Sequence, residues 1–258
     1  MNQSVTIDVN EIARYAGDAV SVTPGGENAD IVLLCEHGGG LIPAAWNNLG
    51  LPEAFLATHF CQDLGSRNLT LSVAKKLDAT GIVSNYSRLF LDYNRKKHDS
   101  GCIRIDMGGI PIPGNIGLSE AERDIRERIA RNPVESAVAD WVEGKISRAK
   151  AIISIHSFSP LWDNNFRSCE VGVMWKGDDR LPLRLINAIG QQEVFRVDDN
   201  EPYSFKESDW FTLDRHGISV GVPNAYIEVR NDLIQSDDLV DKMSDVLVKA
   251  IERSCLGF

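Results

Sequence analysis

The stretch IISIHSFSP, residues 152–160, follows a run of apolar, β-branched side chains with a histidine. Its isoleucines are typical of a short buried strand, and charged residues precede them. We therefore predict a strand over 151–156. His156 stands where this strand ends, and open α/β sheets bind their ligands at the ends of strands. An isolated histidine in such a position is more often an ordinary hydrogen-bonded side chain. A binding role for His156 therefore requires partners from other parts of the chain.

Strand-like and helix-like runs alternate along most of the sequence. Strands are expected over 31–35, 81–87, 89–93, 151–156, 169–175, 193–198 and 226–229. Helices are expected over 52–60, 63–77, 119–147 and 181–191 and from Ser236 onward, with Ser119 and Ser236 as N-caps. A long glycine- and proline-rich loop is expected over 98–117, and a short helix or loop over 205–216.

This alternation predicts the α/β class, as a three-layer sandwich with a mixed, mostly parallel sheet. Residues 1–29 are polar, and we expect them to form a loosely packed lead-in. Nothing after them has the composition of a linker, so a single domain over 1–258 is expected.

The composition excludes several classes of partner. The chain of 258 residues has a formal charge of −10, which argues against nucleic acid and anionic membranes because phosphate binding needs a basic face. A small anionic substrate remains compatible, since a few local arginines can hold it. No apolar run is long enough to span a membrane, and the N-terminus lacks the basic start and apolar core of a signal peptide.

The five cysteines have no metal-site or disulfide spacing. They are scattered and odd in number, at Cys35, Cys61, Cys102, Cys169 and Cys255. This usage predicts reduced thiols in a cytoplasmic protein.

Polar residues follow or interrupt several of the apolar runs. Glu36 and His37 follow IVLLC, His156 follows IISI, Glu228 lies within AYIEV, and Asp63 opens a predicted helix. If the strands are parallel, these positions lie along one edge of the sheet. Two imidazoles and a carboxylate there would make a three-ligand zinc site with a position left for water. A further carboxylate could then serve as general base and acid.

Each of these residues also has a plainer interpretation. His37 precedes three glycines and could occupy a tight turn, and Asp63 could be only an N-cap. Glu228 could pair with Arg230 at an exposed strand edge, although an unpaired carboxylate within an apolar strand is costly. His216 follows WFTLDR, where a helix C-terminus would favour it.

A second group of residues is suited to binding a carboxylate. Guanidinium groups bind carboxylates in a bidentate manner. Arg230 is two residues from Glu228, so both side chains are expected on one face of their strand. Ordinary ion pairs with nearby aspartates are the alternative, and His59 and His98 are expected at the surface. The candidates are Arg88, Asn94, Arg95, Arg104 and Arg230.

Five blocks of the sequence resemble the N-formylglutamate amidohydrolase family. They are CEHGGGLIP (35–43), DLG (63–65), SRLFLDYNR (87–95), HSFSP (156–160) and IEVRNDLI (227–234), in the order seen in that family. The resemblance spans roughly residues 30–250. It implies a phosphorylase/hydrolase-like fold, shared with zinc exopeptidases, and hydrolysis of an N-acyl amino acid. The type activity of the family converts N-formyl-L-glutamate to formate and L-glutamate in one route of histidine degradation.

The chain is also similar, more distantly, to the zinc-dependent N-acetylmuramoyl-L-alanine amidases. This similarity implies that His37, Asp63 and His156 bind zinc and that Glu228 is the general acid and base. Glu36 is expected either to replace Asp63 as a ligand or to orient an imidazole from outside the ligand set.

Together these features predict a cytoplasmic amidohydrolase that uses zinc or another divalent metal and acts on a small, anionic N-acyl amino acid. Arg88, Arg95 and Arg230 would hold the carboxylates of this substrate. Asn94 and Ser157 would bind its amide or acyl oxygen, and His216 would stabilise the oxyanion.

Two alternatives remain open at this point. One is a peptidoglycan amidase or a carboxypeptidase-like zinc hydrolase, against which the lack of an export signal counts. The other is a non-catalytic binding protein for an acidic metabolite.

Overall fold

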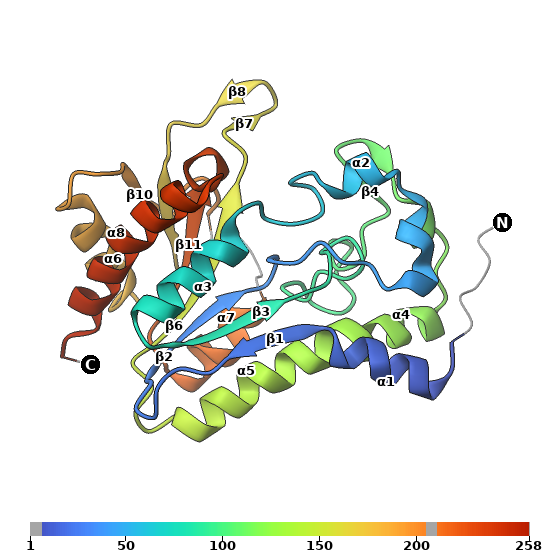
Figure 1. Cartoon of the computed structure of the whole chain (residues 1–258), viewed down its shortest axis with the longest axis horizontal. Helices are drawn as coiled ribbons and strands as arrows, with labels where there is room; N and C mark the ends of the chain where they lie inside the picture. The colour runs from blue at the N-terminus through green and yellow to red at the C-terminus, as the bar shows by residue number, and fades with distance from the viewer. Residues whose placement is uncertain (1–6, 205–210, 258) are drawn as a thin grey trace.

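The computed structural model describes residues 7–204 and 211–257, and a seven-stranded sheet lies at its centre (Figure 1). The strand order is β1-β3-β2-β6-β11-β9-β10. Strands β3, β2, β6 and β11 are parallel, β1 is antiparallel to β3, and β9 is antiparallel to β11 and parallel to β10. The strands are β1 (Val20–Thr23), β2 (Ile31–Cys35), β3 (Thr80–Ser84), β6 (Ala151–Phe158), β9 (Val171–Met174), β10 (Val197–Asp199) and β11 (Asn224–Arg230).

Helices cover both faces of this sheet, as Figure 1 shows. One apolar core joins the sheet to α3 (Ser66–Lys76), α6 (Pro182–Gly190) and α8 (Asp237–Cys255). A second core lies on the opposite face, against α5 (Asn132–Lys145) and α7 (Phe211–His216). The four central strands are buried on both faces, as expected for parallel strands between helical layers. The predicted α/β sandwich with a mixed, mostly parallel sheet is confirmed.

The predicted helix starts are also confirmed where the capping chemistry is explicit. Ser119 and Glu122 form a reciprocal capping box at the start of α4 (Glu120–Arg126), and the Ser236 side chain accepts from the backbone of Leu239 in α8. The helix expected over 119–147 is interrupted by a π-helical turn, Glu127–Arg131, between α4 and α5.

Three local predictions are wrong. Residues 89–93 form turns, because Leu89 and Phe90 pack into a third apolar cluster beside the sheet. The helix expected over 52–60 is only α2 (Glu53–Leu56). The lead-in is not loosely packed, since α1 (Val9–Gly17) buries Ile12 and Tyr15, and β1 joins the sheet.

The remaining elements are short. Residues 205–210, part of the helix or loop expected over 205–216, lie outside the described residues. The short elements are η1 (Ala44–Gly50), β4 (Asp106–Met107), β5 (Ile110–Pro111), η2 (Pro113–Asn115), β7 (Leu161–Trp162), β8 (Asn165–Phe166), η5 (Ile218–Val220) and η6 (Asn231–Ile234).

All five cysteines are free and buried. Burial raises the pKa of the Cys61 thiol to about 11 and that of the Cys255 thiol to about 12. Across residues 7–204 and 211–257, no helix is both long and apolar enough to cross a membrane. The single-domain organisation stays a prediction.

Candidate functional site

The parallel strands bring the predicted site residues to one edge of the sheet. His37 follows β2, His156 lies on β6, and Glu228 on β11 stands directly opposite His156 in the strand register. Asp63 reaches the same edge because its backbone N–H donates to the carbonyl of His37 at 2.9 Å. All four side chains are buried, so three strands and the start of α3 place them together within the protein.

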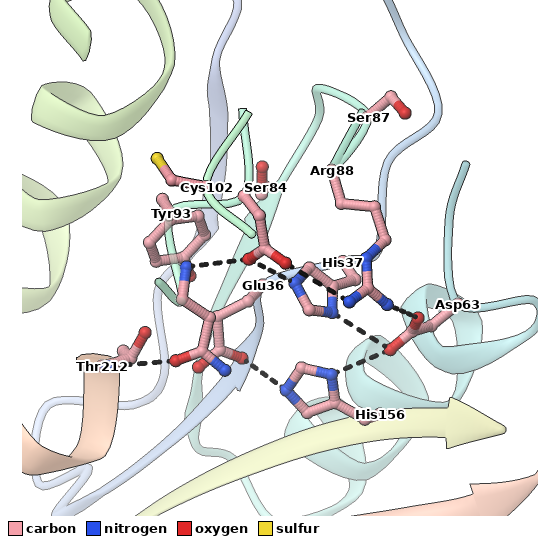
Figure 2. A network of polar contacts seen from close by, with 12 residues as sticks. Glu36, His37, Asp63, Ser84, Ser87, Arg88, Tyr93, Cys102, His156 and Thr212 are labelled. Atoms are coloured by element: carbon pink, nitrogen blue, oxygen red, sulfur yellow. Dashed lines mark hydrogen bonds and ion pairs between the residues drawn. The ribbon is translucent and has the colours of Figure 1, made fainter. Parts of the chain in front are cut away.

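Asp63 lies between the two imidazoles, as Figure 2 shows. Its Oδ2 is 3.4 Å from Nδ1 of His37 and 2.8 Å from Nδ1 of His156, and the two ring centroids are 4.9 Å apart. One ligand atom from each of the three residues falls within 4.8 Å of the others. Tetrahedral zinc with N and O ligands at its usual bond lengths separates neighbouring ligand atoms by roughly 3.3 Å. The separation of 3.4 Å between His37 and Asp63 is close to that value, and the separation of 2.8 Å between His156 and Asp63 is shorter.

A carboxylate holds the other nitrogen of each ring. Nε2 of His37 is 2.8 Å from Oδ1 of Asp92, and Nε2 of His156 is 3.1 Å from Oε2 of Glu36. Glu36 also accepts a hydrogen bond from Ser154 and lies across His156 from Asp63 (Figure 2). Outer carboxylates of this kind fix the orientation of metal-binding imidazoles. The geometry therefore favours Asp63 as the acidic ligand and Glu36 as an orienting partner.

Electrostatics links these groups closely. Burial alone would raise the pKa of the Asp63 carboxyl, but the His37 and His156 imidazoles hold it well below its usual value. Burial alone would lower the pKa of His156, yet the Glu36 and Asp63 carboxylates raise it well above its usual value. Burial raises the pKa of Glu228 to about 7. The centre therefore combines several buried carboxylates, which a cation would stabilise.

The donor set fits a divalent metal ion. Nδ1 of His37 is buried and has no hydrogen-bond partner among the described residues, although it faces Asp63. Two imidazole nitrogens and a carboxylate oxygen are common zinc ligands, and three protein ligands leave a position for water. Oε2 of Glu228 is likewise buried without a hydrogen-bond partner among the described residues. His37, Asp63 and His156 thus form a candidate metal-binding group.

A cavity of about 1030 Å³ opens above this group, and its wall carries most of the predicted substrate residues. Arg88 lines it but also pairs with Asp63 and Asp92, each at 3.3 Å. Arg95 and Arg104 line it and form no close ion pair with a carboxylate of the described residues, although Arg95 helps to lower the pKa of Asp92. The cavity wall is therefore rich in cationic groups although the chain as a whole is acidic.

Two polar residues on the cavity wall, Asn94 and Ser157, already form hydrogen bonds within the protein. Oδ1 of Asn94 accepts from the backbone of Thr212 and the hydroxyl of Tyr226, each at 3.0 Å. Its amide nitrogen is left to donate to a ligand. The Ser157 hydroxyl donates to the carbonyl of Leu64 at 2.7 Å.

Two predicted residues are not brought to the cavity. Arg230 is buried, but it donates to Asp232 at 2.8 Å and to the carbonyl of Arg167 at 3.1 Å. His216 ends α7, is buried, and does not line the cavity. Burial lowers the pKa of His216 to about 4. Their predicted roles in substrate binding and catalysis stay predictions.

Sequence reasoning missed several residues of the site. The sequence indicates Asp92 only as an ion-pair partner, although its position in the block SRLFLDYNR is a signal for a role in the site. His59, expected at the surface, is exposed but lines the cavity mouth. The segment after β6, which contains Trp162 and Arg167, is absent from the predicted site but lines the cavity. Its DNN turn between apolar residues signals a hairpin.

Two fully buried side chains, Arg126 and Asn115, fix the loops around the cavity. Arg126 donates to the carbonyl of Phe90 at 3.0 Å and to Oδ1 of Asn115 at 2.6 Å. Nδ2 of Asn115 donates to the carbonyls of Leu89 at 2.9 Å and Arg104 at 2.7 Å. These carbonyls belong to the two loops that carry the cavity arginines. The Arg126–Asn115 pair thus gives irregular backbone a defined position.

Comparison with known proteins agrees with this geometry. The sequence profile of the N-formylglutamate amidohydrolases matches residues 29–235. The chain belongs to this family. It is accordingly a hydrolase that acts on amide bonds, and the expectation of an enzyme is confirmed. No protein among the curated sequences matches the chain.

Two of the matching solved structures share this fold. A gene product of Agrobacterium tumefaciens is 29% identical, with a TM-score of 0.88 and coverage of 93% of this chain and 96% of that one. The N-formylglutamate amidohydrolase of Ralstonia eutropha is 15% identical, with a TM-score of 0.73 and coverage of 92% and 97%. A weaker match is the N-acetylmuramoyl-L-alanine amidase of Clostridium difficile, 14% identical, with a TM-score of 0.40 and coverage of 88% and 96%.

The candidate metal group predicts the effect of removing its ligands. His37→Ala, Asp63→Ala and His156→Ala should each abolish stoichiometric binding of one zinc ion, measured by equilibrium dialysis with metal analysis. Asp92→Asn should lower the affinity by about 10- to 100-fold, because it weakens the group that orients His37. His98→Ala is the control and should bind zinc normally. Full zinc binding by the His156→Ala variant would show that the metal lies elsewhere.

The Arg126–Asn115 pair predicts a stability effect. Asn115→Ala removes hydrogen bonds to two buried carbonyls and to a buried guanidinium, so it should lower the free energy of unfolding by about 3 kcal/mol or more. Chemical denaturation measures this change. Asn68→Ala, an exposed position on α3, is the control and should change stability by less than about 0.5 kcal/mol. Equal free energies of unfolding for the two variants would show that the Arg126–Asn115 pair does not stabilise these loops.

Proposed function

We propose that the protein is a zinc-dependent amidohydrolase of small, anionic N-acyl amino acids, with N-formyl-L-glutamate as the substrate carried over from its family. The observation that carries this proposal is the convergence of His37, Asp63 and His156 beside Glu228 at the floor of one cavity. The buried carboxylates that hold both outer imidazole nitrogens support the same assignment.

His37, Asp63 and His156 would hold the metal ion. Zinc in such a site supplies a Lewis acid that polarises the amide carbonyl and makes bound water a better nucleophile near neutral pH. Asp92 and Glu36 keep the two rings in place by holding their Nε2 atoms. Zinc, rather than another divalent ion, is supported by the mixture of two nitrogen ligands and one oxygen ligand.

Glu228 is the proposed proton carrier. It stands opposite His156 in the register of β6 and β11, lines the cavity, and has a buried carboxylate oxygen free of protein partners among the described residues. As general base it takes a proton from the attacking water. As general acid it then delivers this proton to the amide nitrogen, so that the C–N bond breaks and an amine leaves.

Arginines on the loops beside the cavity floor are proposed to bind the carboxylates of the substrate. Arg95 and Arg104 are available because neither forms a close ion pair with a carboxylate of the described residues. Arg88 adds positive charge while it holds Asp63 and Asp92 in position. The amide nitrogen of Asn94 can donate to the substrate's carbonyl oxygen. A cytoplasmic location and a part in histidine degradation remain predictions.

The proton-transfer role predicts a selective defect. Glu228→Gln should keep zinc binding but lower kcat for N-formyl-L-glutamate by about 10²- to 10⁴-fold, because the amide side chain cannot accept the water proton. Formate release and zinc content are measured on the same sample. The exposed Glu252→Gln variant on α8 is the control and should keep both. Undiminished turnover by Glu228→Gln would exclude the proposed role.

A turnover assay also distinguishes the proposed activity from that of a peptidoglycan amidase. A peptidoglycan amidase would hydrolyse the amide between the lactyl group and the peptide of muropeptides, which releases a peptide with a free amino group, and would leave N-formyl-L-glutamate intact. We expect turnover of N-formyl-L-glutamate and none of muropeptides.

A further inference from the structure

The cavity is polar at its floor and apolar at part of its mouth. The floor residues His37, Asp63 and Glu228 are buried. At the mouth, Leu161 and Trp162 of strand β7 also line the cavity and are 56% and 60% exposed. Pockets of 300–1,000 Å³ usually hold ligands of drug size, and this cavity measures about 1030 Å³. The cavity is therefore much larger than a molecule of N-formyl-L-glutamate requires.

The apolar wall at the mouth is held in place by stacked side chains. The guanidinium of Arg167 lies 4.9 Å from the ring centroids of Trp162 and Tyr203 and 5.5 Å from that of Phe158. Its Nη1 also donates to the Tyr203 hydroxyl at 3.0 Å. Cation–π contacts of this kind stabilise the arrangement of the rings. The hairpin formed by β7 and β8 thus presents a supported aromatic surface, and it projects from the sheet in Figure 1.

The two walls of the cavity differ in chemistry. Arg95 and Arg104, with Asn94, stand on the loops over 94–108. Leu161 and Trp162 stand on the hairpin, and the nearby lining cation Arg167 is already engaged by the Trp162 and Tyr203 rings and the Tyr203 hydroxyl. In a trans amide, the acyl group and the substituent on nitrogen point in opposite directions from the C–N bond. A substrate whose carboxylates bind Arg95 and Arg104 therefore keeps its acyl group away from these arginines, and Leu161 and Trp162 are exposed apolar lining that an aliphatic acyl chain can contact.

We propose that Leu161 and Trp162 form an acyl-binding surface, and that the enzyme prefers N-acyl-L-glutamates whose acyl group is an aliphatic chain longer than formyl. This inference rests on the proposed function, because it assumes amide hydrolysis at the candidate metal group. Burial of a methylene group against such a surface improves binding by about fourfold. A formyl group has no carbon beyond the carbonyl and gains nothing from this surface.

A substrate series tests the preference directly. The zinc-loaded protein is assayed for release of L-glutamate from N-formyl-, N-acetyl- and N-hexanoyl-L-glutamate. We expect kcat/KM to rise along the series, by at least about tenfold from the formyl to the hexanoyl compound. If the formyl compound is hydrolysed faster than the hexanoyl compound, the assignment of Leu161 and Trp162 as an acyl-binding surface is overturned. The proposed amidohydrolase function would still stand. Turnover of none of the three would overturn the proposed function itself.

Two variants then test the residues. Trp162→Ala should lower kcat/KM for the hexanoyl compound by about tenfold and leave that for the formyl compound within about twofold, because only the longer chain contacts the indole. Phe166→Ala is the matched control, since Phe166 lies on the same hairpin, is 64% exposed and does not line the cavity. The Phe166→Ala variant should have the same ratio of kcat/KM for the hexanoyl compound to kcat/KM for the formyl compound as the unmodified protein. An unchanged ratio in a folded, zinc-loaded Trp162→Ala protein would overturn the assignment.

Discussion

The bridging position of Asp63 between two imidazoles is the interaction on which the rest of the site depends. One carboxylate oxygen faces Nδ1 of both His37 and His156, while Asp92 and Glu36 hold the opposite nitrogens. The rings are therefore fixed at both ends, so their orientation does not rely on the ligand that they would bind. Burying several carboxylates together is unfavourable unless positive charge compensates it, which is the electrostatic reason that this centre suits a cation.

The fold supplies this arrangement through two kinds of support. Parallel pairing of β2, β6 and β11 delivers side chains to one edge of the sheet with little freedom in position. The other wall of the cavity consists of loops, and buried hydrogen bonds from Arg126 and Asn115 hold them. Groups on the strands or directly after them, together with Asp63 before α3, are proposed to perform the chemistry. Groups on the loops held by Arg126 and Asn115 and on the β7–β8 hairpin are proposed to select the substrate.

The sheet and its functional edge could be predicted because buried parallel strands have a strong apolar signal that ends at polar residues. The errors lie where the tertiary context decides. Leu89 and Phe90 read as a strand, but an apolar run cannot show whether it joins a sheet or packs beside one. The substrate-binding role of Arg230 stays a prediction; in the structure its side chain donates to Asp232 and to the carbonyl of Arg167. The bond from Asp92 to His37 depends on how a loop closes, which spacing does not reveal.

The central claim is that His37, Asp63 and His156 share one metal ion. The most direct measurement is a crystal structure of the zinc-loaded protein, with anomalous differences recorded on both sides of the zinc absorption edge. The account predicts one anomalous peak about 2.0–2.2 Å from a nitrogen of each histidine and from a carboxylate oxygen of Asp63. A zinc peak bound by other residues, or no peak at this position in loaded crystals, would contradict it.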